Sequence, residues 1–227
     1  VIEGIKVDLS QVPTDDKKTY DILSSGETTG IFQLESSGMR RYIKELKPTS
    51  IFDLQAMVAL YRPGPMANIS EFIKRKHNPS LIRYPDERLR EILKESYGVI
   101  TFQDDVFLTA IKVAGYSWLE ADKLRKAIGK KITSEMKKQH DKFVEGCVIH
   151  GMTRKNAESI WILFEPFAGY GFNKAHAAGY ATIAFRTAYL KAHYPVEFMT
   201  ALLTAESRGT TGPVKNEKIA QAVSECK

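Results

Sequence analysis

Apolar residues recur at three- and four-residue spacing along most of this chain, and this period constrains the fold more than any other feature because it is typical of packed α-helices. Met39, Tyr42, Ile43 and Leu46 form one such apolar face. From Gln103 onward we expect one helix after another, at about 103–114, at 117–128, and at about 134–149, 154–165 and 173–192. The predicted fold class is therefore mainly α, a multi-helix domain with little β structure.

Capping residues and helix breakers mark the boundaries of the earlier helices. Thr14 is placed to cap a first helix and Gly26 to end it. Ser50 and Asp53 have the spacing of a capping box at the start of another. Two prolines in residues 62–65 force a loop, since proline is not tolerated inside a helix.

Three other segments are not expected to be helical. Residues 77–87 resemble a loop, and residues 97–102 form an apolar, β-prone run that predicts one short strand. After a short helix that follows residues 194–195, residues 207–213 have the glycine content of a flexible linker. We therefore predict one domain at 1–206, with parts at about 1–100 and 101–206, and a linker with the start of another helix at 207–227.

The composition is that of an ordinary globular protein and favours an anionic partner. Hydrophobic residues make up 43% of the 227 residues and charged residues 26%, with a formal net charge of +6. No apolar run approaches the roughly 20 residues of a membrane span, so no membrane association is expected. Two cysteines make no disulfide framework, which predicts a cytoplasmic location. The start lacks an initiator Met and a signal peptide, and is interpreted as a cut inside a longer protein.

The sharpest candidate site is a Gly-rich segment at residues 167–180 that opens the longest helix. Its first N–H groups and the side chains of Asn173, Lys174 and His176 are suited to hold a phosphate. Its aromatic residues are suited to stack on a base or sugar: Tyr170, Phe172 and Tyr180. The alternative is an ordinary helix cap with aromatic core packing. The segment lacks the Gly-Lys-Ser/Thr pattern of a P-loop.

A second candidate is basic and lies near the end of the helix at 117–128. Cations are favoured there in any case, so a solvated helix end and contact with a phosphate backbone remain alternatives. Arg62 is suited to bind a phosphate or to form a structural ion pair. Gln33 and Glu35 either orient a ligand or cap the next helix. The basic cluster consists of Lys123, Arg125, Lys126, Lys130 and Lys131.

Metal ligands and catalytic acids are poorly represented in the sequence. His140, Cys147 and His150 share a possible helix face but lack a metal-binding pattern, so we predict no metal site. Adjacent acids at 15–16 and 104–105 diverge by about 100° on a helix, which favours helix-start charges over a two-metal site. We predict no catalytic residue within this chain.

Taken together, these motifs resemble the bacterial DNA polymerase III alpha subunit, the C-family replicative DNA polymerases. The resemblance covers nearly the whole chain in the right order. It is carried by residues 26–36 (GETTGIFQLES), 59–65 (ALYRPGP), 75–77 (RKH), 97–100 (YGVI), 121–131 (ADKLRKAIGKK), 167–176 (FAGYGFNKAH) and 192–199 (AHYPVEFM).

This resemblance implies a fingers domain, which covers the incoming deoxynucleotide (dNTP) and the template. The family's catalytic aspartates lie in the palm, before this stretch, so Mg²⁺ would be held outside this chain and none bound by the chain itself. The expected partners are primer-template DNA, dNTPs, the rest of the alpha subunit, and the replicase with its sliding clamp and clamp loader. The expected location becomes the bacterial cytoplasm, at the nucleoid.

The resemblance also sharpens the site hypotheses. For phosphates we favour Lys174, His176, Asn173 and Arg125, with Tyr170 and Phe172 as the wall of the nucleotide pocket. For DNA we favour Lys126, Lys130, Lys131 and Arg62. The sequence departs from its relatives at residues 103–106 (QDDV), where many carry Gln-Glu-Gln-Val, and at Ala175 and Gly179. A stand-alone nucleic-acid-binding module and a helical protein-interaction scaffold are the alternative functions.

Overall fold

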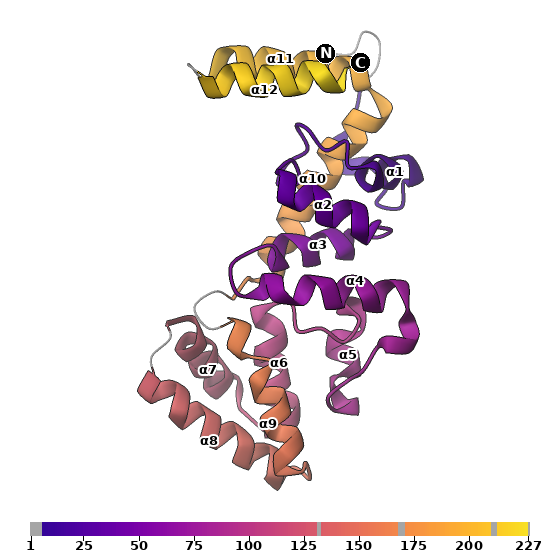
Figure 1. The fold of residues 1–227 in the computed structure, drawn as a ribbon. Helices are drawn as coiled ribbons and strands as arrows, with labels where there is room; N and C mark the ends of the chain where they lie inside the picture. Colours follow the sequence, from indigo (N-terminus) through magenta and orange to yellow (C-terminus); the bar gives the residue numbers. More distant parts are fainter. Residues whose placement is uncertain (1–5, 131–132, 168–170, 210–212, 227) are drawn as a thin grey trace. The chain divides into compact units, whose positions relative to one another are not determined.

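The computed structural model describes residues 6–130, 133–167, 171–209 and 213–226. In this part of the chain the backbone forms α-helices and short 3-10 turns, with no strand (Figure 1). The mainly α fold class is therefore confirmed. The chain divides into two compact units, unit 1 (Val1–Leu54 with Gly179–Lys227) and unit 2 (Gln55–Ala178).

Unit 1 is formed by the N-terminal and C-terminal segments of the chain. A 3-10 turn at Leu9–Gln11 precedes its first helix. Its helices are α1 (Lys17–Ser25), α2 (Ser37–Leu46), the start of α3 (Ile51–Leu60), most of α10 (Lys174–His193), α11 (Pro195–Gly209) and α12 (Pro213–Glu225).

The helix ends of unit 1 follow local capping chemistry. Asp16 caps α1 by accepting the Thr19 N–H at 2.8 Å, so the predicted Thr14 cap is wrong. The Thr14 carbonyl instead accepts the hydroxyl of Tyr20 at 2.7 Å. Gly26 ends α1 with φ +80°, as predicted. The capping box at α3 is also confirmed, because the Ser50 N–H donates to the Asp53 carboxylate at 3.2 Å and the Asp53 N–H to the Ser50 hydroxyl at 3.4 Å.

A buried cation ties unit 1 together. Lys191 of α10 has a side chain only 5% exposed. Its ammonium donates to the carbonyls of Glu27 at 3.0 Å and Thr29 at 2.8 Å, and it pairs with the carboxylate of Glu225 in α12. Lys191 thereby fixes both the loop after α1 and the last helix against α10.

Unit 2 holds the middle of the chain. Short 3-10 turns join its helices at Pro65–Asn68, Pro79–Leu81, Glu87–Leu89, Lys94–Ser96 and Glu165–Phe167. Besides the end of α3 and the first turn of α10, its helices are α4 (Ile69–His77), α5 (Arg90–Leu93), α6 (Gln103–Ala114), α7 (Trp118–Lys130), α8 (Thr133–Ile149) and α9 (Arg154–Ile162).

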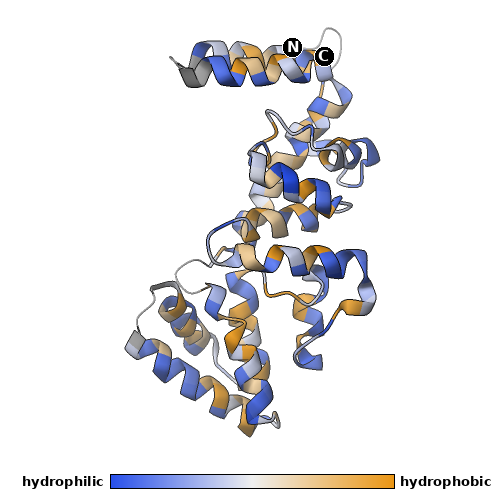
Figure 2. Ribbon diagram, in the orientation of Figure 1, coloured by the Kyte–Doolittle hydropathy of each residue, from blue (hydrophilic) through white to orange (hydrophobic). Residues whose placement is uncertain are grey.

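The core of unit 2 is aromatic, with Phe143 of α8 at its centre. The Phe143 ring lies 5.2 Å from Phe164, 5.7 Å from Trp161 and 6.5 Å from Tyr116, centroid to centroid. Cys147 is fully buried in the same cluster, and burial raises the pKa of its thiol to about 11. Figure 2 shows hydrophilic and hydrophobic residues alternating along α8, as expected for a helix with one buried face.

Two glycines permit close backbone approaches in unit 2. A Cβ at Gly146 of α8 would lie 2.4 Å from the Ala114 carbonyl oxygen of α6, so only glycine allows these helices to pack at this distance. Gly64 has φ +96°, and a Cβ there would lie 2.6 Å from the Pro166 carbonyl oxygen. The loop that carries Arg62 is therefore fixed by its backbone.

Three predicted boundaries are wrong. Residues 97–102 are not a strand, because Tyr97 and Gly98 both adopt positive φ and turn the chain, and the apolar residues after them fill a helical core. α9 ends at Ile162 rather than at about 165, and the chain then enters the 3-10 turn Glu165–Phe167, which contains Pro166.

The third wrong boundary is the end of α11. This helix has 15 residues and extends through residues 207–209, where a linker was predicted, while residues 210–212 lie outside the described residues. Hydroxyls of Thr200, Thr204 and Ser207 donate to carbonyls three or four residues earlier, so these polar groups are paired within the helix. Throughout the described ranges, no helix has both the length and the apolar character needed to cross a bilayer.

Candidate nucleotide-binding site

The first turn of α10 is held against the start of α6. The Gln103 N–H donates to the Phe172 carbonyl at 3.0 Å, and the Lys174 N–H donates to the Asp104 carboxylate at 2.8 Å. A Cβ at Gly171 would lie 2.8 Å from the Gln103 Cβ, so this close approach requires glycine or a local shift. The loop before α10 is therefore positioned by α6 through backbone contacts.

Lys174 has a partner for its side chain as well as for its backbone. Its ammonium lies 2.9 Å from the Glu95 carboxylate and 5.7 Å from the centroid of the Phe102 ring. The Lys174 and Glu95 side chains are 39% and 40% exposed, so water reaches both. The candidate phosphate ligand is thus an accessible cation with an exchangeable partner.

Asn173 and His176 form the N-terminal cap of α10. The Asn173 side-chain oxygen accepts the His176 N–H at 2.9 Å, which makes Asn173 the cap. Two N–H groups in the first turn, those of Lys174 and His176, therefore already have protein acceptors. The side chain of Lys174 is partly exposed and that of His176 is exposed, so both remain accessible from solvent.

Phe172 brings Arg62 to the same loop. Its side chain is buried, and the Arg62 guanidinium lies over its ring at 4.1 Å from the centroid. The His176 ring lies 5.2 Å from the Phe172 ring. The structure therefore places Arg62, predicted to bind DNA, beside the residues predicted to bind nucleotide.

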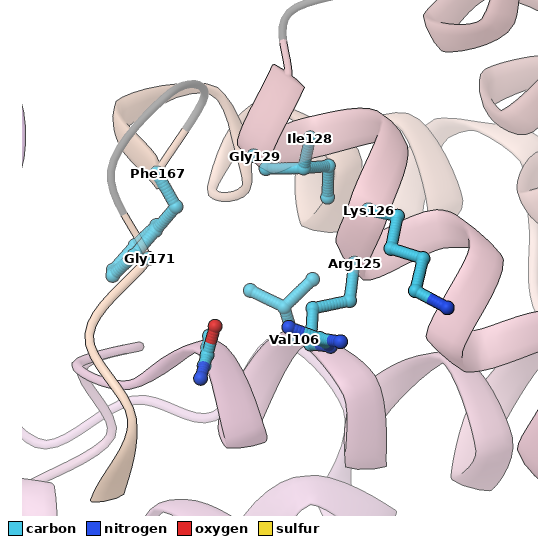
Figure 3. Close-up of a pocket in the computed structure, with 8 residues that line it drawn as sticks. Val106, Arg125, Lys126, Ile128, Gly129, Phe167 and Gly171 are labelled. Atoms are coloured by element: carbon cyan, nitrogen blue, oxygen red, sulfur yellow. The ribbon is translucent and has the colours of Figure 1, made fainter. Parts of the chain in front are cut away.

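A pocket of about 200 Å³ lies between this loop and α7. Figure 3 shows Phe167 and Gly171 on one side and Arg125, Ile128 and Gly129 of α7 on the other. Gln103, Val106 and Lys126 complete its lining. Arg125 and Lys126 share one counterion, Asp122, at 2.7 and 2.6 Å, so this trio keeps a net charge of +1.

The acids of α6 have structural roles, which confirms the interpretation of 104–105 as helix-start charges. The Asp105 carboxylate accepts the N–H groups of Thr101 and Phe102, both at 2.9 Å. Burial raises the pKa of Asp105 to about 6, although these hydrogen bonds and the Lys174 charge oppose that shift. Asp104 and Asp105 therefore diverge, one toward α10 and one toward the preceding loop.

The other candidates are scattered or engaged locally. Glu35 accepts the Gly30 N–H at 3.2 Å, and Gln33 is exposed with φ +63°. His140 lies between the carboxylates of Asp141 and Glu158, at 3.0 and 2.7 Å. Among the described residues, no three His, Cys, Asp or Glu side chains are grouped to hold a metal ion.

Some predicted residues are not brought into the site by the structure. Tyr170 and Lys131 lie outside the described residues, as does the side chain of Lys130. Lys123 is exposed on α7.

Sequence reasoning missed the acidic partners. Asp122 carried a local signal, three and four residues before its two cations. Glu95 is 79 residues from Lys174 and carried none.

The fold and the site define a basic, helical segment with a small pocket that Arg125 and Lys126 border, and comparison with known proteins identifies its class. A family model described as the bacterial DNA polymerase III alpha subunit finger domain matches residues 1–151. The chain belongs to this family.

Individual relatives are DNA polymerase III alpha subunits. The chain is 49% identical to that of Bacillus subtilis (strain 168) over 203 residues, covering 89% of this chain and 18% of the relative. It is 46% identical to that of Thermus aquaticus over 209 residues (90% and 17%), and 45% identical to that of Escherichia coli (strain K12) over 227 residues (97% and 19%). The chain thus spans less than a fifth of the length of each.

Proposed function

We propose that this chain acts as the fingers of a full-length alpha subunit, a DNA-directed DNA polymerase, and positions the incoming dNTP and the template there. The observation that carries the proposal is the convergence of Lys174, Phe172 and Arg62 on one loop, with Arg125 across the adjoining pocket. A triphosphate is the polyanion that such a cationic border suits. Family membership supports the same substrate class.

The chemical step would depend on residues outside this chain. Replicative transfer uses two Mg²⁺ ions on carboxylates to activate the primer hydroxyl and stabilise the leaving pyrophosphate. No group of acids in the described residues fits such ions. The part proposed for this chain is therefore positioning and electrostatic stabilisation.

The residues divide into two roles. Lys174, His176, Asn173 and Arg125 would bind phosphate oxygens, and Tyr170 and Phe172 would form the wall of the nucleotide site, with Phe172 next to Gly171 of the pocket lining rather than part of that lining itself. The α7 end would follow the DNA backbone with Lys126, Lys130 and Lys131, and Arg62 would link the two regions. The further partners proposed are primer-template DNA, the rest of the subunit, the sliding clamp and the clamp loader, in the bacterial cytoplasm at the nucleoid.

Substitution of Lys174 by alanine in the full-length subunit tests the proposal. A charge-assisted hydrogen bond contributes roughly 1.5–3 kcal/mol, so we expect kcat/KM for nucleotide to fall about 10- to 150-fold while primer-template affinity changes little. Lys94→Ala is the matched control, because Lys94 is an exposed lysine that pairs with Glu91 at 2.8 Å. If Lys174→Ala changes nucleotide kinetics less than about twofold, as expected for an ordinary surface lysine, the phosphate site is assigned to the wrong residues.

The second candidate is a stand-alone nucleic-acid-binding module, which the net charge of +6 favours. If the chain instead acts as the fingers of the full-length subunit, we expect the isolated chain to show no primer extension. We then expect it to bind DNA no tighter than about micromolar at physiological salt. A filter-binding titration against salt separates the candidates. A DNA-binding module gives a steep decrease of log K with log salt, whereas a protein-interaction scaffold gives no binding at all.

A further inference from the structure

Lys174 has three carboxylates near it, which is unusual for a residue offered to an anionic substrate. Glu95 lies 2.9 Å from its ammonium, Asp104 accepts its backbone N–H at 2.8 Å, and the Asp105 carboxylate interacts with its charge. The Lys174 ammonium is therefore already paired with an anion. A phosphate would have to compete with the Glu95 carboxylate, which already pairs with the Lys174 ammonium.

We propose that Glu95 is a placeholder anion, which holds the Lys174 ammonium in the nucleotide-free state and is displaced by the triphosphate. This inference rests on the proposed function and adds a competing residue to that site. It makes Glu95 a positioning residue for nucleotide binding, one that contacts Lys174 and no reacting atom.

The geometry separates the exchangeable contact from the permanent one. Glu95 contacts only the tip of a flexible side chain, and both groups of the pair are about 40% exposed, so water can replace either partner. Asp104 instead accepts a backbone N–H and joins α6 to α10. Displacing Glu95 leaves the helix start intact, whereas displacing Asp104 would uncap it.

Charge decides the direction of the exchange. A triphosphate carries several negative charges against the single charge of Glu95, so it competes well for one ammonium. After the exchange, Glu95 remains near the phosphates as a like charge and opposes their binding. Neutralising Glu95 therefore removes both the competitor and the repulsion. The chemical step is unaffected, because Glu95 does not contact the reacting groups.

The test is steady-state kinetics of the full-length subunit with Glu95→Gln, which keeps the size of the side chain and removes its charge. We expect KM for nucleotide to fall about two- to fivefold, the range that an exposed ion pair supports, with kcat unchanged. The matched control is Glu91→Gln, which breaks the exposed Glu91–Lys94 pair one turn earlier and removes the same charge. This control is expected to leave KM unchanged.

A double-mutant cycle gives the decisive comparison. In a Lys174→Ala background, Glu95→Gln should lower KM for nucleotide by less, because only the repulsion between Glu95 and the phosphates is then removed. The effects of the two substitutions on KM should therefore not multiply. The inference is overturned if Glu95→Gln leaves KM unchanged, or if Glu91→Gln lowers it equally. In either case Lys174→Ala decides the proposed function separately, because a large defect there upholds the phosphate site without a placeholder.

Discussion

The two lysines at opposite ends of α10 show how differently the two units use a positive charge. Lys191, in unit 1, is 5% exposed and binds two carbonyls and a carboxylate. Lys174, in unit 2, is 39% exposed and holds one carboxylate with its side chain. A buried cation must be fully partnered because it has lost its water, whereas an exposed one can exchange partners at little cost. The environment of Lys191 is that of a structural ion pair, whereas that of Lys174 allows its partner to be exchanged.

The units also differ in what else stabilises them. Unit 2 has an aromatic cluster of Tyr116, Phe143, Trp161 and Phe164, all buried. Both tryptophans of the chain, Trp118 and Trp161, lie in unit 2. Tryptophan fluorescence therefore reports on unit 2 alone, while far-UV circular dichroism reports on both units. With these two signals, a loss of stability can be assigned to one unit or to both.

The largest effect is expected from Lys191→Met. It removes the buried cation and leaves Glu225 and two carbonyls without their partner, which costs about 3–5 kcal/mol. In a urea titration, helical signal should be lost at lower denaturant while tryptophan fluorescence still reports a folded unit 2. The control is Lys174→Met, which should cost less than about 1 kcal/mol. If both signals shift together, the two units unfold as one and the contrast between them fails.

The next effect tests a buried charge in unit 2. The folded pKa of Asp105, about 6, lies above its ordinary value of 3.8, so the folded state binds this proton more tightly. Stability is therefore lost as pH rises from about 4 to about 6 and is level above that range. Asp105→Asn keeps an oxygen for the Thr101 and Phe102 N–H groups and removes this loss. Relative to the unsubstituted chain, the free energy of unfolding of this variant should rise by about 2 kcal/mol between pH 4 and pH 7, measured by tryptophan fluorescence.

A third comparison uses two helical glycines. Gly146→Ala places a methyl group 2.4 Å from the Ala114 carbonyl oxygen and forces α6 and α8 apart, which costs about 1–3 kcal/mol. Gly179→Ala, in unit 1, meets nothing within 4 Å and should stabilise by up to about 1 kcal/mol. Thermal melts of both variants check the opposite signs. Equal effects would mean that the close helix contact is not maintained in solution.

The smallest effect is expected at His140, which joins α8 to α9. Its hydrogen bonds to Asp141 and Glu158 raise its pKa above the ordinary 6.5. Its stabilising contribution is therefore complete below pH 6.5 and is lost as pH rises through the folded pKa. His140→Gln should cost up to about 1 kcal/mol at pH 6 and less at pH 8. Denaturant titrations at both pH values, with Trp161 as the nearby fluorophore, measure the difference, and a pH-independent cost would refute the assignment.

The sequence alone predicted the helices well because their signals are local. The cap at Ser50 and the glycine at 26 both depend on residues within one turn of the helix end. The predicted strand at 97–102 failed because two consecutive positive φ angles and the surrounding helices outweighed its β propensity. Local chemistry sets the ends of helices, and packing decides what an apolar run becomes.

The candidate site was predicted only in part, for the same reason. The Gly-rich loop and its basic residues were visible in the sequence, but their partners were not. Asp104 and Glu95 reach Lys174 from 70 and 79 residues away. Arg62 reaches Phe172 from a separate loop, 110 residues earlier by number. Such pairings follow from tertiary packing, so only the folded chain reveals which cation has which anion.

The burial of Cys147 has a practical consequence for chemical labelling. Alkylating reagents attack the thiolate, and a thiol with a pKa of about 11 that is also enclosed in the core provides almost none at neutral pH. Cys226, the other cysteine of the chain, is exposed. A maleimide dye should therefore attach at a single position without any cysteine being removed, which gives the natural sequence a defined handle beside the end of α12.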